Sequence, residues 1–324
     1  MSGPLVVAGE VIEVKAIANA DRIRLATVSC GAAGTWSGVV GLDMEVKDDV
    51  VVFLQDALLP PDERWAFMAK QNWRVKMCRF RGAPSECLIL KADRPHMHET
   101  GADLTELYGV TKYEKPLPVG SAGDIIGGFP SWISKTDEEN FQRVPDALER
   151  MRDGMWYATE KADGTSCTVW NDEDGMHVCS RQFELKEFLD SGASNLYWRM
   201  ARKYAMERII PGYVVQFEIV GPGVQGNPMG LTVNEIRLFN VYHRAIHKRL
   251  SYPTMLGIAN HHSMPMARRI ELTEDQLDKR DWTEDDLRKL AEIKYQNGKP
   301  GEGIVIRDVE NKWSFKVLNL LYKD

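Results

Sequence analysis

Short β-rich runs separated by turn residues fill the first 90 or so residues, and this pattern most restricts how the chain can fold. About five such strands with little helix predict a small barrel, and an OB-like barrel fits this size. Turn residues stand between the runs at Asn19–Asp21, Gly31–Gly34 and Arg81–Pro84. The expected strands are Leu5–Val7, Val11–Val14, Leu25–Val28, Val50–Leu54, Val75–Phe80 and Cys87–Leu90.

A mixed pattern of helices and strands follows a connector rich in Gly and Pro, at about residues 116–130. Helices are expected at 137–144, at 195–210 and from an N-cap at Thr283 toward Asn297–Gly298. The whole chain is therefore expected to be α+β, with one domain at 1–125, including the linker, and a second at 126–324. The expected strands of the second domain are Cys167–Trp170, His177–Cys179, Tyr213–Val220, Ile236–Tyr242 and Ile304–Ile306.

Charge and hydrophobicity exclude several classes of protein. A net charge of -6 argues against a protein that coats nucleic acid by bulk electrostatics. The longest apolar runs, such as Val50–Leu54, are far shorter than the roughly 20 residues of a membrane-spanning helix. The N-terminus lacks the basic start and apolar run of a secretory signal, and the five cysteines are scattered. We therefore expect a cytoplasmic protein with no membrane partner and no obligate protein partner.

One local stretch, from Arg64 to Ser85, has six basic residues and no acidic one. Aromatic residues alternate with the basic ones, as on surfaces that follow a nucleic-acid backbone and stack on bases. A strand pair with a solvated basic face explains the same pattern equally well. The candidate nucleic-acid-binding residues are Arg74, Lys76, Arg79 and Arg81.

The most informative motif is Lys161-Ala162-Asp163-Gly164, placed between two expected strands. On average residue frequencies, a K-x-D-G match would occur by chance in about 8% of chains of this length, so the tetrad alone is weak. It gains weight from an ordered series that follows it. The series consists of Ser180-Arg181, Phe217-Glu218, Phe239, Glu302 to Arg307, and Phe315-Lys316.

This order resembles the covalent nucleotidyltransferase superfamily of polynucleotide ligases and mRNA capping enzymes. Within it, the chain is most similar to ATP-dependent RNA ligases that carry an OB module ahead of the catalytic domain. The segments 160–166 and 135–139 both resemble that family, and a looser resemblance rests on 19–22 and 79–82. The resemblance implies an N-terminal OB-like nucleic-acid-binding domain followed by a nucleotidyltransferase (adenylyltransferase) domain.

The resemblance also implies roles for single residues. Lys161 would carry AMP as a phosphoramidate, and Lys316 would contact the α-phosphate. A lysine attacks phosphorus only when deprotonated, and its usual pKa of about 10.4 makes that form rare at neutral pH. Lys316 and a metal held near Glu302 are the candidates for lowering the pKa of Lys161.

The remaining implied roles concern the nucleotide and the metal. Glu218 and Glu302 would lie at the ribose and at a hydrated Mg²⁺ or Mn²⁺. Asp163 would orient the nucleophile or the water molecules bound to the metal. Nucleotide contacts are also implied for Glu160 at the adenine pocket, Gly164 in the motif, Phe239 stacked on adenine, and Arg181 at a phosphate or the ribose.

Each of these assignments has a plainer explanation. Phe217 and Phe239 suit a hydrophobic core, and Glu218 or Glu302 could form ordinary salt bridges. Arg181 and Arg307 could be solvated strand ends. The last motif also departs from the K-x-K of many relatives, because Lys316-Val317-Leu318 has one lysine.

The order of domains separates the enzymatic candidates. DNA ligases and capping enzymes generally place an OB domain after the last motif, whereas Val317 to Asp324 alone follow Lys316 here. The expected function is thus an ATP-dependent RNA ligase that seals 3′-OH/5′-phosphate breaks through a lysyl-AMP intermediate. Its expected partner is a nicked duplex with RNA on the 3′-OH side. The alternatives are an ATP-dependent DNA ligase and a non-catalytic nucleic-acid-binding protein with a decayed transferase domain.

Overall fold

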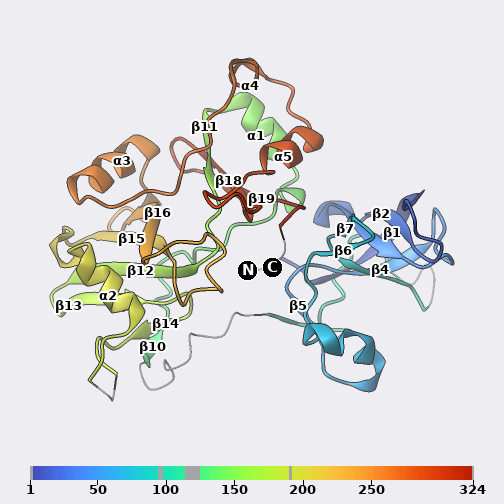
Figure 1. Ribbon diagram of the computed structural model, residues 1–324, viewed down its shortest axis with the longest axis horizontal. Helices are drawn as coiled ribbons and strands as arrows, with labels where there is room; N and C mark the ends of the chain where they lie inside the picture. The colour runs from blue at the N-terminus through green and yellow to red at the C-terminus, as the bar shows by residue number, and fades with distance from the viewer. Residues whose placement is uncertain (1–2, 94–97, 114–124, 190–191, 323–324) are drawn as a thin grey trace. The chain divides into compact units, whose positions relative to one another are not determined.

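The computed structural model describes residues 3–93, 98–113, 125–189 and 192–322 (Figure 1). The chain divides into two compact units. The first takes in the described residues up to 113 together with Phe141–Pro145, and the second takes in those at 125–140 and 146–322. The boundary expected between residues 125 and 126 adjoins residues 114–124, which lie outside the described part.

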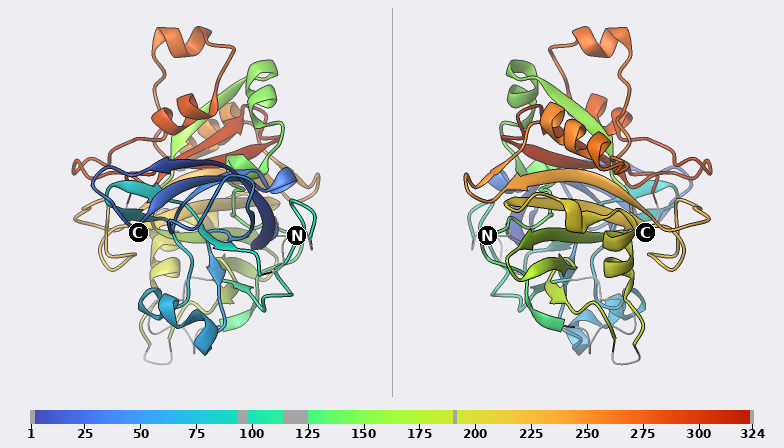
Figure 2. Two further views of the ribbon diagram at one scale, coloured as in Figure 1. Left: turned by 90° about the vertical axis from the view of Figure 1, so that its right-hand side faces the viewer. Right: turned by 90° about the vertical axis from the view of Figure 1, so that its left-hand side faces the viewer.

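The first unit is built on a five-stranded antiparallel sheet with the order β3-β2-β1-β4-β8. The longest strand, β1, lies in the middle and has a register shift between Val11 and Glu13, which bends the strand. Figure 2 shows the blue strands of this sheet curving. The amide of Glu86 donates to the carbonyl of Ser37 in β3, at 2.8 Å. The strands are β1 (Val6–Ala16), β2 (Arg24–Ser29), β3 (Thr35–Val40), β4 (Asp49–Phe53) and β8 (Leu88–Lys91).

The first part of β1 is buried on both faces, because successive side chains of a strand point to opposite faces and Val6–Gly9 are all buried. Val7 and Val11 join one hydrophobic cluster, whereas Val6 and Ala8 join another. Smaller elements surround the sheet. They are the pairs β5 (Ala57–Leu58) with β9 (Thr111–Lys112) and β6 (Cys78–Phe80) with β7 (Ala83–Ser85), and the 3₁₀ helices Gly31–Ala33 and Glu63–Gln71.

The second unit contains two antiparallel sheets. The larger has the strand order β10-β14-β13-β12-β15-β16-β17, and the smaller has the order β11-β18-β19. The larger consists of β10 (Ile125–Gly128), β12 (Thr165–Asp172), β13 (Gly175–Cys179), β14 (Phe183–Leu185), β15 (Tyr213–Val220), β16 (Glu235–His243) and β17 (Lys248–Arg249). The smaller consists of β11 (Trp156–Glu160), β18 (Gly303–Asp308) and β19 (Ser314–Leu318).

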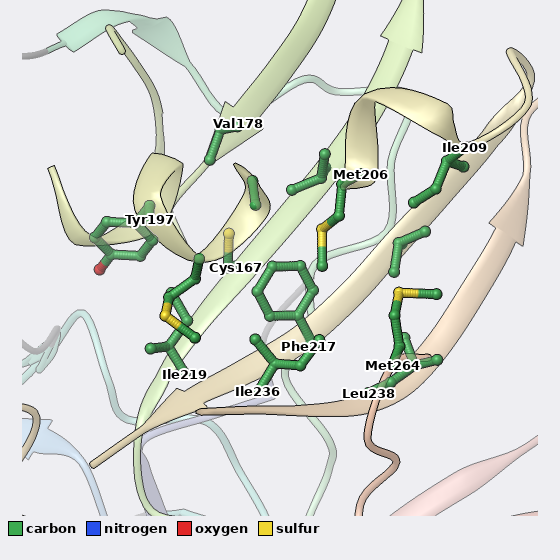
Figure 3. Packing of buried hydrophobic residues seen from close by; sticks show 14 of the residues in the cluster. Cys167, Val178, Tyr197, Met206, Ile209, Phe217, Ile219, Ile236, Leu238 and Met264 are labelled. Atoms are coloured by element: carbon green, nitrogen blue, oxygen red, sulfur yellow. The ribbon is translucent and has the colours of Figure 1, made fainter. Parts of the chain in front are cut away.

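One face of the larger sheet carries the main hydrophobic core (Figure 3). Phe217 and Ile219 from β15 pack there with Ile236 and Leu238 from β16, and Tyr197 comes from the helix α2. Alternation along β15 leaves Gln216 and Glu218 on the opposite face. The core therefore holds one face of the sheet and presents Glu218 on the other.

The described residues of the second unit also form five short α-helices. They are α1 (Ala147–Asp153), α2 (Leu196–Lys203), α3 (Tyr252–His261), α4 (Glu274–Asp278) and α5 (Glu284–Leu290). The same unit has a 3₁₀ helix at Met206–Arg208, and another 3₁₀ helix, Phe141–Arg143, belongs to the first unit. The mixture of strands and short helices confirms the expected α+β composition. No helix within the described residues is long and apolar enough to cross a membrane.

Helix ends differ from the sequence-based expectation. The capping box that begins α5 at Thr283 is confirmed, because Thr283 accepts from the amide of Asp286 and Asp286 accepts from that of Thr283. The helix expected at 195–210 begins after its N-cap Asn195 but ends at Lys203, since Ala205 has a left-handed backbone with φ of 49°. The helix expected at 137–144 is wrong, because only one 3₁₀ turn forms before Pro145.

A histidine bridged by two acids joins β12, β13 and β14. His177 lies 2.6 Å from Glu184 and 2.8 Å from Asp172, and its ring stacks on Trp170. Burial disfavours the charged ring, but the hydrogen bonds to the two acids outweigh this effect and raise the pKa of His177. The protonated ring donates from both nitrogens and ties the three strands together.

Stability should therefore depend on pH through His177. A raised folded-state pKa gives stabilisation that is complete below the unfolded value of about 6.5 and is lost as pH rises through the folded value. Replacing His177 by Gln should lower the free energy of unfolding by about 1 kcal/mol at pH 6 and by less at pH 9. Urea unfolding of both proteins at the two pH values measures this difference. An equal loss at both would contradict it.

Candidate active site

Lys161 directly follows β11, which is an outer strand of the smaller sheet. Its amide donates to the carbonyl of Gly303 at 2.8 Å, which extends the pairing of β11 with β18 by one step. On the next strand Lys316 pairs with Val305, which in turn pairs with Thr159. Paired residues share a face, and so do residues two apart, so Lys161 and Lys316 lie on the same face of this sheet.

Three acids act on the Lys161 side chain. Nζ lies 2.5 Å from Oε1 of Glu302, the residue just before β18. Burial lowers the pKa of Lys161, but the charges of Glu302, Glu218 and Asp163 outweigh burial, so the pKa is raised. Without nucleotide or metal the acids therefore favour the charged form of Lys161, and the expectation that Lys316 and a bound metal lower its pKa stays a prediction.

Gly164 explains how the Lys161 segment comes so close to β15. A Cβ added at Gly164 would lie 2.2 Å from the carbonyl oxygen of Ile219 and 2.8 Å from Cγ of Glu218. Only glycine allows this approach. The structure thus supports a spatial role for Gly164, which brings the Lys161–Gly164 segment beside Glu218.

The donor set fits a hard divalent cation. Asp163, Glu218 and Glu302 offer carboxylate oxygens, which Mg²⁺ prefers, and all three act on one lysine. Within the described residues, no group of three or more His, Cys, Asp or Glu is assembled to hold a metal ion directly. Mg²⁺ usually keeps several of its waters, so few direct protein ligands are needed.

Glu160 is buried and paired with Arg268. Oε2 of Glu160 accepts from Nε and Nη2 of Arg268, at 3.0 and 2.7 Å, and the amide of Glu160 donates to the carbonyl of Arg268 at 2.7 Å. Such charge-assisted pairs fix the orientation of a carboxylate. The sequence analysis missed Arg268, because no local pattern links residues that are 108 positions apart.

Phe239 is the extra residue of a β-bulge in β16. Gln216 pairs with Asn240, but the next residue, Phe217, pairs with Leu238, so Phe239 has no partner on β15. Bulges re-aim side chains and are common near active sites. The core interpretation holds for Phe217, whereas Phe239 is half-buried.

Arg307 lies beside Phe239, its guanidinium carbon 5.7 Å from the ring centroid. Arg307 is buried and donates to Glu138 at 3.1 Å and to Oγ1 of Thr159 at 3.0 Å. The interpretation of Arg307 as a solvated strand end is therefore wrong. A buried cation within about 6 Å of a ring is attracted to it, so Arg307 and Phe239 support each other.

Arg181, which was expected to contact a phosphate or the ribose, is paired with an acid. Its Nη2 lies 2.7 Å from Oδ1 of Asp137, in the segment 135–139 that resembles the ligase family. Oγ1 of Thr136 in the same segment lies 2.8 Å from Oγ of Ser166 in β12. These contacts place the segment beside the residues that follow Lys161.

The basic stretch belongs to the first unit and is mostly not strand. Arg74 lies 2.9 Å from Asp56 and covers the ring of Tyr113, so its charge is partly neutralised. Arg81 is exposed, and Lys76 and Arg79 are half-exposed. Among the aromatic residues, Trp65 is buried, whereas Phe67 and Phe80 are 56% and 41% exposed.

Solved structures of an RNA ligase from Naegleria gruberi resemble this chain over nearly its whole length. A ligand-free variant matches with 27% identity and a TM-score of 0.80, and the match covers 98% of this chain and 96% of the other. A variant with AMP and Mn has the same identity and TM-score and covers 97% and 96%. A variant with ATP and Mn also has 27% identity and a TM-score of 0.80 and covers 97% of each chain.

Sequence comparisons point to the same family. No curated protein matches the chain. The model of the family described as RNA ligase matches residues 154–321, just over half of the 324 residues. This match begins before Lys161 and ends beyond Lys316, and the chain therefore belongs to the RNA ligase family.

Proposed function

We propose that this RNA ligase uses ATP to adenylate Lys161 and then seals 3′-OH/5′-phosphate breaks. The observation that carries the proposal is the environment of the Lys161 amine. The amine lies 2.5 Å from Glu302, and the negative charges of Glu218 and Asp163 also act on it. Lys316 lies on the same face of the sheet. Titratable groups whose pKa is shifted by burial and by specific charged partners are typical of functional sites. The Naegleria structures with ATP or AMP and Mn support the choice of nucleotide and of a divalent cation.

The first step is attack of the neutral Lys161 amine on the α-phosphorus of ATP. An N–P bond forms, the bond from the α-phosphorus to the bridging oxygen breaks, and pyrophosphate leaves with the electron pair. Lys161 loses one ammonium proton to solvent before it attacks, and its nitrogen loses a second proton to solvent as the N–P bond forms, which leaves the phosphoramidate N–H. A divalent cation at Asp163, Glu218 and Glu302 would offset the acidic charges that keep Lys161 protonated. Lys316 would stabilise the negative charge that develops on the α-phosphate.

The surrounding residues would bind the nucleotide. Phe239, re-aimed by its bulge and backed by Arg307, would stack on adenine. Glu160, held by Arg268, would lie at the adenine pocket. Arg181 would exchange Asp137 for a phosphate or the ribose. Phe239 and Glu160 are each already held by a neighbour, which reduces the ordering that binding requires.

In the later steps AMP passes from Lys161 to a 5′-phosphate end, and a 3′-OH then attacks and expels AMP. Positioning and charge stabilisation supply most of the catalysis in such transfers. The proposed substrate is a nicked duplex with RNA on the 3′-OH side. The curved sheet of the first unit is consistent with an OB-like domain, which would bind the duplex through Arg79, Arg81 and the exposed Phe80.

Replacing Lys161 by Ala should abolish labelling of the protein by ATP that carries radioactive label in its α-phosphate. The expected loss is about 1,000-fold or more, because the nucleophile itself is removed. Replacing the exposed Lys289 by Ala is the matched control and should leave labelling unchanged. Labelling of both variants at the wild-type level would contradict the proposal, and no labelling of any protein would favour the non-catalytic alternative.

The sugar on the 3′-OH side of the nick should decide the rate of sealing. Nicks that end in ribose should be sealed at least about tenfold faster than otherwise identical nicks that end in deoxyribose, since the 2′-OH is the group that distinguishes RNA from DNA. Single-turnover sealing by the preadenylated protein measures both rates. Equal rates, or faster sealing of the DNA end, would favour the DNA ligase alternative.

The double substitution of Arg79 and Arg81 by Ala should weaken sealing but spare adenylation. The KM for nicked duplex should rise. The slope of log KM against the logarithm of salt concentration should fall by about one for each phosphate that an arginine no longer neutralises. Replacing Lys15, an exposed lysine of the same unit that pairs with Glu13, by Ala is the control. An unchanged KM in the double variant would remove this surface from the proposal.

A further inference from the structure

The hydroxyl group of Tyr295 joins two segments of the candidate active site. It accepts from the amide of Asp163 at 3.3 Å and from the amide of Glu302 at 3.1 Å. It also donates to the carbonyl of Lys161 at 3.3 Å. One buried side chain thus contacts the backbone of the lysine, of the aspartate two residues later and of the glutamate that pairs with the lysine.

These three bonds match the capacity of a phenol. A tyrosine hydroxyl supplies one donor and two acceptor sites, and here one carbonyl and two amides take them. The Tyr295 side chain is only 2% exposed, so water cannot readily replace it. Tyr295 is itself held by a bond from its amide to the carbonyl of Lys299 at 2.9 Å.

A second tyrosine holds the Asp163 side chain. The hydroxyl of Tyr322 donates to Oδ2 of Asp163, and the rings of Tyr322 and Tyr295 meet edge to face with centroids 6.5 Å apart. Tyr295 belongs to a hydrophobic cluster with Val220, at the end of β15, and both Tyr322 and Ala162 pack against this cluster. Neighbouring tyrosines therefore fix the backbone of the Lys161–Asp163 segment and the carboxylate at its end.

We propose that Tyr295, together with Tyr322, positions Lys161 and Asp163 against Glu302 for nucleotide transfer. The inference rests on the proposed function, because it assigns a role in adenylation of Lys161. Neither tyrosine is a catalytic residue, since both act through the lysine and the acids. Misplacement of a nucleophile by about 1 Å can cost about 100-fold in rate. Loss of the Tyr295 hydroxyl would leave two amides and a carbonyl unpaired and would allow such a shift.

The test compares three tyrosine-to-phenylalanine substitutions in the full-length protein. Tyr295→Phe and Tyr322→Phe remove the two positioning hydroxyls. Tyr157→Phe is the matched control, because Tyr157 is equally buried in β11 and donates one hydrogen bond, to Asn311 at 3.1 Å. The measured quantities are the rate of lysyl-AMP formation at saturating ATP, the ATP concentration that gives half that rate, and the melting temperature.

We expect Tyr295→Phe to slow adduct formation by about 10- to 100-fold and to change the half-saturating ATP concentration by less than about threefold. Tyr322→Phe should slow adduct formation by about 3- to 10-fold. Tyr322 is only half-buried, so this position tolerates the substitution. The control should keep the wild-type rate. Hydrogen exchange of the Asp163 and Glu302 amides should accelerate in Tyr295→Phe and not in the control.

Adduct formation by Tyr295→Phe and Tyr322→Phe at the rate of the control would overturn the proposal. A rate loss that follows the melting temperature equally in all three variants would also overturn it, since that pattern is purely structural. A Tyr295→Phe protein that does not fold leaves Tyr322→Phe and the control to decide. Absence of the adduct from the wild-type protein would instead refute the proposed function, so the two failures are distinguishable.

Discussion

The contact between Lys161 and Glu302 is the interaction on which the site depends. A lysine amine is held 2.5 Å from one carboxylate while two more acids act on it, and burial opposes its charge. Removing charges from water costs several kcal/mol per ion, so a purely structural role would be served more cheaply by apolar residues. Three acids around one lysine leave an excess of negative charge, which suits a site that also binds a cation.

The fold produces this arrangement through backbone register rather than through flexible side chains. Pairing of β11 with β18 sets Lys161 beside the segment of Glu302, and pairing of β18 with β19 adds Lys316. Gly164 lets the same segment approach β15, where the core on the far face fixes Glu218. Sites built on strands in this way hold their groups more precisely than sites on loops.

Much of the site could be predicted from the sequence because its residues lie in short motifs. Lys161, Asp163 and Gly164 form one tetrad, and Glu218, Glu302 and Lys316 each lie in or beside a β-rich run. Arg268 and Tyr295 could not be predicted, since each contacts a residue more than 100 positions away. The bulge at Phe239 depends on how β16 pairs with β15, and the end of α2 depends on the left-handed backbone of Ala205. Neither feature has a local signature in the sequence. The bulge arises from strand pairing, and alanine seldom adopts a left-handed backbone.

The central claim is that a covalent nucleotide forms on Lys161. Wild-type protein can be incubated with ATP and Mg²⁺ or Mn²⁺, digested, and analysed by tandem mass spectrometry to locate any added AMP. The account predicts a single adenylated peptide with the modification on Lys161. An adduct on another residue, or peptides that remain unmodified after incubation with either metal, would contradict it.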